Sequence, residues 1–198
     1  MSTVVPANPS PRQEALLTDF DDRFLNILGE RFMHSRESLG PLIERVARRG
    51  TMVEVGSLCG FSTAFFAARF ERVISIDPYS PGYDPEDRNS AAPRLELARQ
   101  VFRLRFFDDP RVTQHNETSE VGAKRFEDRS LDFVYLDAGH AYDAVKHDIS
   151  FWLPKIREDS WIAGDDYDWK GARQAIEEAF TRHDVVEGRW IARVADAR

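Results

Sequence analysis

The chain has 198 residues, 42% of them hydrophobic and 12% aromatic, which is enough for one substantial core and too little for two ordinary domains. Its formal net charge of −7, without a basic run that would neutralise phosphates, argues against a nucleic-acid partner and favours a small-molecule substrate. With one cysteine, no apolar signal segment and no run of membrane-spanning length, the composition indicates a soluble, cytoplasmic protein without disulfides or membrane contact.

The N-terminal part of the chain is expected to lie outside the main core. Residues 1–12 contain three prolines and suggest a draped arm, and apolar residues then recur at helical spacing at Leu16, Leu17, Phe20, Phe24 and Leu28. We expect residues 1–35 to form a lid over their own site or the contact in a homodimer. A second helix is indicated by Leu39, Leu42, Ile43 and Val46. Residues 36–198 should then form the core of a single domain.

From residue 52 onward the pattern alternates between short apolar runs and helical spacing. Strands are predicted at residues 52–55, 73–76, 112–115, 131–136 and 161–163, with helices at 61–69, 93–107, 121–126, 142–154 and 172–180. Two short strands, 185–186 and 190–194, meet at the turn residues 187–188. This alternation predicts an α/β fold: a Rossmann-like, doubly wound, mostly parallel seven-stranded sheet with helices on both faces and a C-terminal antiparallel β-hairpin.

A glycine loop follows the first of these strands. The sequence from Gly56 to Gly60 turns the chain into the next helix, and Asp77 ends the second strand 21 residues after Gly56. Backbone N–H groups at such a loop attract a polar or anionic ligand group, and an acidic residue at this distance holds a ribose diol. Leu58 stands where a dinucleotide site needs its middle glycine, which disfavours an NAD-dependent oxidoreductase. A ligand with a ribose and no pyrophosphate, such as S-adenosylmethionine, fits better.

An acidic group is expected at the same edge of the sheet. Asp137 follows the fourth predicted strand, and Asp165 and Asp166 follow the fifth, so the carboxyl ends of these strands bring three carboxylates together. Because crowded like charges are costly, we expect a divalent cation such as Mg²⁺ there. Asp137 or Asp165 taken alone is better explained as a cap of the helix that follows, and it is the group of three that favours a metal. His140 lies three residues beyond Asp137 and is either the catalytic base or a solvated residue at a helix start.

These segments resemble class I S-adenosylmethionine-dependent methyltransferases, in particular the small metal-dependent O-methyltransferases of the catechol type and their relatives that methylate sugar hydroxyls in natural products. The resemblance covers residues 38–180. It implies that Glu54, Gly56 and Ser62 hold the methionine end of the cofactor and that Asp77 holds the ribose. Further cofactor contacts are predicted at Ser57, Gly60, Thr118, Ser119 and Asp137, with Thr118 and Ser119 near the adenine.

The resemblance also implies chemistry for the acidic group. Asp137, Asp165 and Asp166 match the metal ligands of the metal-dependent branch, and the first two are 28 positions apart in the sequence. The chain departs from that branch at His140, where catechol enzymes have a basic lysine, and at Gly139, where the sugar enzymes have an aspartate.

We therefore predict metal-dependent methyl transfer to a hydroxyl of a small molecule, a sugar, a catechol or another natural product, with Asp137 and His140 as catalytic residues. Two alternatives remain. One is a metal-independent methyltransferase with His140 as base, and the other is a non-catalytic module that binds S-adenosylmethionine or a nucleotide. The irregular segment 78–92, which carries Tyr79 and Tyr83, is either a wall of the site or a surface excursion.

Overall fold

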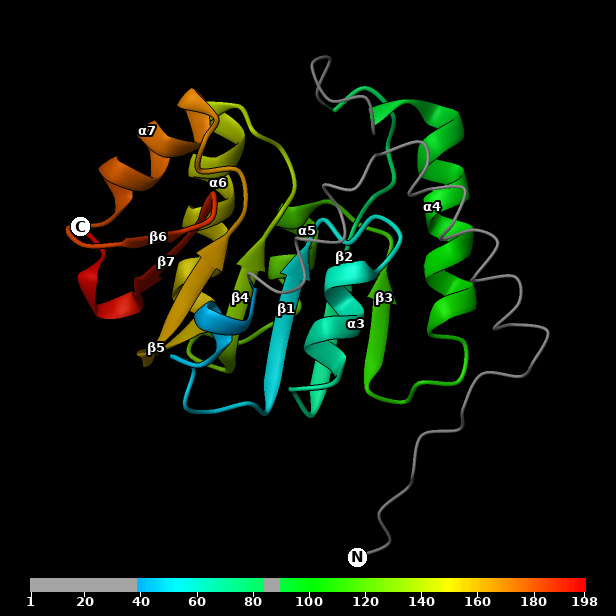
Figure 1. Ribbon diagram of the computed structural model, residues 1–198, viewed down its shortest axis with the longest axis horizontal. Helices are drawn as coiled ribbons and strands as arrows, with labels where there is room; N and C mark the ends of the chain where they lie inside the picture. The colour runs from blue at the N-terminus through cyan, green and yellow to red at the C-terminus, as the bar shows by residue number, and fades with distance from the viewer. Residues whose placement is uncertain (1–38, 84–89) are drawn as a thin grey trace, which may run out of the picture.

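A computed structural model describes residues 39–83 and 90–198 (Figure 1). The predicted N-terminal arm and helix, with their role as lid or dimer contact, lie outside the described residues, as does part of the 78–92 segment. Residues 39–43 are helical, in agreement with the second predicted helix.

The centre of the structure is a seven-stranded sheet with the order β3-β2-β1-β4-β5-β7-β6. The first five strands in this order run parallel, and β7 runs antiparallel to both β5 and β6. Their bounds are β1 Thr51–Val55, β2 Arg72–Ile76, β3 Val112–His115, β4 Leu131–Leu136, β5 Ile156–Gly164, β6 Asp184–Val186 and β7 Arg189–Arg193. The predicted doubly wound sheet with its antiparallel C-terminal hairpin is confirmed.

Helices cover both faces of this sheet. The helix α3 lies in front of it in Figure 1, and α5 and α6 lie behind it. The helices and 3₁₀ turns are α3 Phe61–Ala67, α4 Ala92–Arg105, α5 Ser119–Ala123, α6 Tyr142–Trp152, η2 Leu153–Lys155, α7 Lys170–Ala179 and η3 Val194–Asp196. Crossover helices between parallel strands bury both faces of the sheet, which explains why all six residues of β4 are buried.

Alternation along the strands divides the core into two layers. In β4, Val134 and Leu136 pack toward α5, α6 and α7, whereas Phe133 and Tyr135 pack toward α3. Phe66 of α3 makes an edge contact with Phe133, with ring centroids 6.3 Å apart. Successive side chains of a strand point to opposite faces, so the parity of each position decides which layer it joins.

The strand β5 differs from the prediction at its start. It begins at Ile156 and not at residue 161, because Leu131 pairs with Ile156 while Phe133 pairs with Trp161. Between these two pairs, β5 therefore contains three more residues than β4. Glu158 and Asp159, which lie in this stretch of β5, are exposed. Because the first part of β5 has a polar sequence, its beginning cannot be predicted from apolar runs.

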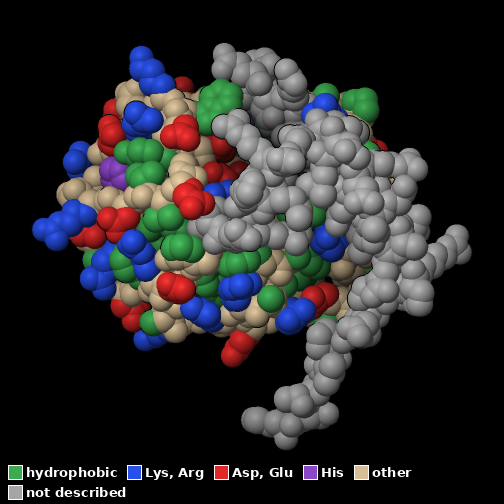
Figure 2. Space-filling view, viewed as in Figure 1, with side chains coloured by type: hydrophobic (Ala, Val, Ile, Leu, Met, Phe, Trp, Pro, Cys, Tyr) green, Lys and Arg blue, Asp and Glu red, His purple; other side chains and the backbone are tan. Residues whose placement is uncertain are grey.

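None of the helices in residues 39–83 and 90–198 has the length and apolar character needed to span a membrane. On the face in Figure 2, basic and acidic side chains are interspersed among the coloured residues.

The end of β1 is pressed against the residue that follows β4. Asp137 donates its N–H to the carbonyl of Val55 at 2.8 Å, and Gly56 has φ 83°. A Cβ at Gly56 would lie 1.8 Å from the carbonyl oxygen of Asp137. Only glycine combines this backbone conformation with this approach, so the glycine loop and Asp137 are held side by side.

Replacing Gly56 by Ala should therefore destabilise the fold by about 3 kcal/mol or more, because the new Cβ forces the ends of β1 and β4 apart. Urea unfolding followed by circular dichroism measures the change. Gly82→Ala is the matched control, since Gly82 has φ 78° and open space around its missing Cβ. The control should cost about 1 kcal/mol, the conformational penalty alone. Equal losses in the two variants would contradict the close approach.

Candidate active site

The carboxylate of Asp77 organises the glycine loop. Its Oδ2 accepts hydrogen bonds from the backbone N–H groups of Ser57 at 3.1 Å and Leu58 at 3.0 Å, and its Oδ1 accepts one from Tyr79 N–H at 2.8 Å. Leu58 has φ 45°, a conformation that these bonds help to hold. Burial raises the pKa of Asp77. The acidic residue predicted to hold a ribose is thus anchored against the loop that should receive the same ligand.

Tyr79 supports the loop from the other side. Its hydroxyl donates to the carbonyl of Leu58 at 2.7 Å and accepts from Gln114 Nε2 at 3.0 Å. Burial is the main reason that the pKa of Tyr79 is raised. From the sequence, the segment with Tyr79 is either a wall of the site or a surface excursion. Its support of the loop was not predicted, because the contact depends on a turn directly after Asp77 that has no sequence signal of its own.

Glu54 lies beneath the loop, in β1. The residue has no exposed surface, and its Oε2 accepts a hydrogen bond from the Thr63 hydroxyl. Its Oε1 has no hydrogen-bond partner among the residues that the structure describes. Burial raises the pKa of Glu54 to about 7, and hydrogen bonds from Ser62 and Thr63 act in the opposite direction. An ammonium group of a ligand would satisfy this oxygen, so the site fits the amino-acid end of S-adenosylmethionine.

The two predicted glycine and serine positions at the start of α3 are close to Glu54. Gly60 has φ 82° and stands directly before α3, and a Cβ there would meet the Phe106 ring at 2.5 Å. Ser62 lies in the first turn of the helix and is half-buried. The structure therefore brings Glu54, Gly56, Ser57, Gly60, Ser62 and Asp77 together around the glycine loop, here called the cradle, and their contact with a cofactor stays a prediction.

The predicted adenine residues are partly engaged elsewhere. The Thr118 side chain accepts from Val121 N–H at 3.5 Å and caps α5. The Ser119 hydroxyl accepts from Trp152 Nε1 at 2.8 Å and hydrogen bonds with Asp148, whose pKa burial raises to about 6. The Ser119 hydroxyl thus already has one donor and one acceptor partner in the protein, and the adenine assignment stays a prediction.

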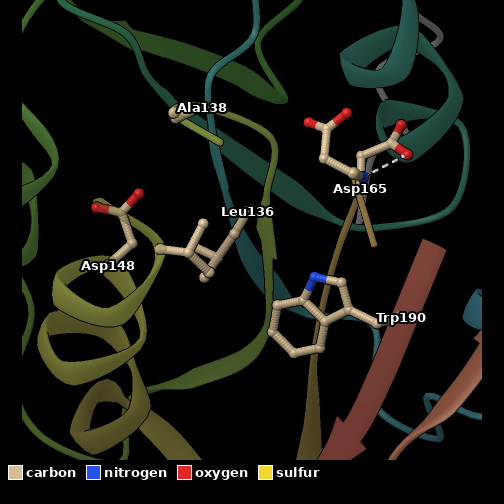
Figure 3. A pocket seen from close by; sticks show the side chains of 8 residues that line it. Leu136, Ala138, Asp148, Asp165 and Trp190 are labelled. Atoms are coloured by element: carbon tan, nitrogen blue, oxygen red, sulfur yellow. Dashed lines mark hydrogen bonds between the residues drawn. The ribbon is translucent and has the colours of Figure 1, made fainter. Parts of the chain in front are cut away.

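Asp137, Asp165 and Asp166, together called the acidic rim, each meet a different environment. Asp165 Oδ2 lies 3.1 Å from Arg189 Nη2, and Asp166 Oδ2 lies 2.9 Å from His140 Nε2. Figure 3 shows Asp165 at the end of β5, above Trp190 of β7. Burial and then the neighbouring Asp165 and Asp166 carboxylates raise the pKa of Asp137 well above its usual range. Asp137 therefore lies in the negative field of the other two carboxylates.

The side chains of the acidic rim are not arranged as the predicted magnesium site requires. Among the described residues, no group of three Asp, Glu, His or Cys side chains is arranged to hold a metal ion. The Arg189 guanidinium already contacts Asp165, so a dication at that carboxylate would face a like charge at close range. The negative charge is instead balanced by side chains of the chain itself.

His140 is held in one orientation. Its ring stacks on Trp169, with centroids 4.7 Å apart and an interplanar angle of 14°. Its Nε2 faces Asp166, a residue with φ 65° whose N–H donates to Asp165 Oδ1 at 2.9 Å. Non-glycine residues adopt such a conformation at a cost, and they are found where a side chain must be aimed. A carboxylate beside an imidazole favours one tautomer and stabilises the protonated ring.

Arg189 is the site residue that the sequence analysis missed. The predicted last strand starts one residue later, at Trp190, and an arginine after a glycine turn is normally a solvated residue. The residue is 7% exposed. Its position follows from the register of β7 on β5, which a single sequence does not reveal.

Comparison with known proteins places the chain in a family. Residues 53–167 match the family described as a methyltransferase domain, and since this is more than half of the chain, the protein belongs to that family. The resemblance to class I S-adenosylmethionine-dependent methyltransferases is thereby confirmed. No curated protein matches the sequence.

Solved structures share the fold at low sequence identity. CalS11, a calicheamicin methyltransferase, has a TM-score of 0.62 at 16% identity, over 99% of this chain and 98% of its own. The cofactor-bound Rv0187 from MTB has a TM-score of 0.60 at 18% identity, over 98% of this chain and 94% of its own. Spermidine synthase has a TM-score of 0.59 at 16% identity, over 83% of this chain and 60% of its own. The fold thus hosts more than one kind of reaction.

Replacing Glu54 by Gln should flatten the pH dependence of stability between about pH 4.5 and 7. The folded chain keeps a proton on Glu54 up to about pH 7, whereas the ordinary pKa is 4.5. The unfolded chain releases that proton first, so stability falls as the pH rises through this window, by about 3 kcal/mol from this residue. Urea unfolding at the two ends of the window measures the difference.

The same change at Glu71, an exposed residue before β2, should leave the wild-type slope in place. A Glu54→Gln variant with the wild-type slope would show that Glu54 is ionised throughout.

Proposed function

We propose that the protein transfers the methyl group of S-adenosylmethionine to a hydroxyl oxygen of a small molecule. The observation that carries the proposal is the pairing of two half-sites by the contact of Gly56 with Asp137: a cradle for the cofactor on one side, and the His140–Asp166 pair on the other. The membership of the methyltransferase family supports the type of group transferred.

The cradle supplies binding and orientation. Glu54 Oε1 is the acceptor for the cofactor's ammonium group, Asp77 is the acceptor for its ribose hydroxyls, and the loop N–H groups surround its methionine end. When bound, S-adenosylmethionine supplies an electrophilic methyl carbon on a positively charged sulfur. Most of the rate enhancement comes from aligning the acceptor oxygen with this carbon.

His140 serves as the base. The imidazole of His140, whose Nε2 lies 2.9 Å from Asp166 Oδ2, takes the proton of the acceptor hydroxyl while the oxygen forms its bond to the methyl carbon and the carbon–sulfur bond breaks. The products are the methyl ether, S-adenosylhomocysteine and the proton on His140. Asp166 stabilises the imidazolium, and Trp169 keeps the ring in its plane. The divalent cation implied by the catechol-type resemblance has no step in this proposal.

A sugar or catechol hydroxyl is the acceptor class favoured here. CalS11 is described as a TDP-rhamnose 3'-O-methyltransferase, and it covers nearly the whole of this chain. The aromatic face of Trp169, which is partly exposed beside His140, suits the apolar face of either a sugar or an aromatic ring.

The direct test is turnover with S-adenosylmethionine and a panel of catechols and nucleotide-linked sugars, followed by mass spectrometry of both products. We expect S-adenosylhomocysteine and one methyl ether to form in equal amounts. Binding of S-adenosylmethionine without turnover on any hydroxyl acceptor would favour the non-catalytic module. Product from an amine acceptor alone would overturn the assignment to oxygen.

His140→Ala should lower kcat by about 10²–10⁴-fold, because the acceptor hydroxyl loses its proton acceptor. Calorimetric titration should show that affinity for S-adenosylmethionine is retained. His147→Ala is the matched control, since His147 lies on the exposed side of α6, stacked on Phe151. An active His140→Ala variant would remove this residue from the mechanism.

A further inference from the structure

Arg189 is a buried cation whose place is set by the hairpin register. Trp190 of β7 pairs with Gly164 of β5 in antiparallel register, so the next residues outward, Arg189 and Asp165, are neighbours. The Arg189 side chain is 8% exposed, and its Nη2 lies 3.1 Å from Asp165 Oδ2. A buried guanidinium keeps its charge, because arginine does not lose its proton in proteins.

Strand parity gathers further groups on the same side of the sheet. Tyr135 and Ile191 pack into the layer that faces α3, and Arg189 shares the parity of Ile191. The Tyr135 hydroxyl hydrogen bonds with Arg189, and Asp137 and Asp165 are the carboxylates that interact with it electrostatically. The guanidinium therefore lies at the point where the ends of β4, β5 and β7 meet.

The buried cation and the buried carboxylates depend on one another. An ion pair taken out of water is tolerated only when both charges and their remaining polar groups are matched, and removing one partner leaves an uncompensated buried charge. The positive charge of Arg189 offsets part of the negative charge of the acidic rim. A dication bound to Asp165 would have to displace the guanidinium or approach it against its repulsion.

We propose that Arg189 is the permanent counter-ion of the acidic rim, taking the charge-balancing role of a divalent cation, and that this chain therefore binds no catalytic metal ion. The part that concerns methyl transfer without metal rests on the proposed function. The part that concerns metal affinity does not. Arg189 acts here through Asp165 and Tyr135, so it is a positioning residue and not one that touches the acceptor.

Binding of Mn²⁺ alone, followed by electron paramagnetic resonance on the full chain, tests the proposal without any substrate. We expect no stoichiometric Mn²⁺ binding to the wild type. Arg189→Met removes the charge and should tighten Mn²⁺ binding by about tenfold or more, because the rim then lacks a counter-ion. Arg189→Lys keeps a cation and should restore the wild-type behaviour. The double variant with Asp165→Asn should lose the gained affinity, which locates the ion at the rim.

Arg193→Met is the matched control on the same strand. Arg193 is exposed and stacks on Trp161, 5.4 Å from the ring centroid, so its loss should leave Mn²⁺ binding unchanged. If Arg189→Met does not fold, as judged by its thermal unfolding, the wild type and Arg189→Lys still decide the question. Wild-type binding of one Mn²⁺ per chain that is lost in Asp165→Asn overturns the proposal.

Turnover in the presence of a chelator adds an independent arm. Wild-type methyl transfer should keep its rate when divalent ions are removed, and a rate that falls on chelation and returns with Mg²⁺ would contradict the metal-free reaction. Absence of turnover under every condition would count against the proposed function alone, since the Mn²⁺ titrations do not depend on it.

Discussion

The contact between Gly56 and the backbone of Asp137 sets the distance between the two halves of the site. β1 and β4 are neighbours in the sheet, and the bare Cα of Gly56 lets the strand ends approach to a separation that any side chain would prevent. The cofactor cradle starts from one of these strands and the acidic rim from the other. Methyl transfer needs its two reactants aligned to within a fraction of an ångström, and this backbone contact is the fixed point for both.

Charge is the second constraint, and it follows from the first. Bringing the strand ends together also brings Glu54 near Asp137, and Asp77 acts on Glu54 in turn, so burial and neighbouring negative charge raise the pKa of both Glu54 and Asp137. Two side chains face this negative charge: His140, from the loop before α6, contacts Asp166, and Arg189, from β7, contacts Asp165. Each carboxylate of the pair after β5 is thereby given a separate task.

Much of this could be predicted because it is encoded locally. The glycine loop, Asp77 and the carboxylates after β4 and β5 are read from strand ends, and parallel strands place their carboxyl ends on one edge. The start of β5 could not be read, since Arg157 to Ser160 carry the polar pattern of a loop while forming an irregular strand. The roles of Tyr79 and Arg189 could not be predicted for another reason. The role of Tyr79 depends on a turn and that of Arg189 on the register of β7, and neither is a property of the residue itself.

The antiparallel hairpin therefore contributes more than an edge to the sheet. Because β7 enters between β5 and β6, its first residue lies inside the molecule, beside the end of β5, and not at the rim of the sheet. A slip of one residue in this register would turn Arg189 to the opposite face, toward the apolar layer that Trp190 now fills against Phe180. The large side chain of Trp190 opposes Gly164, where a Cβ would come within 2.6 Å of its Nε1, and this fit between a bulky and a bare position holds the register. The packing of one tryptophan thus determines which charge the acidic rim receives.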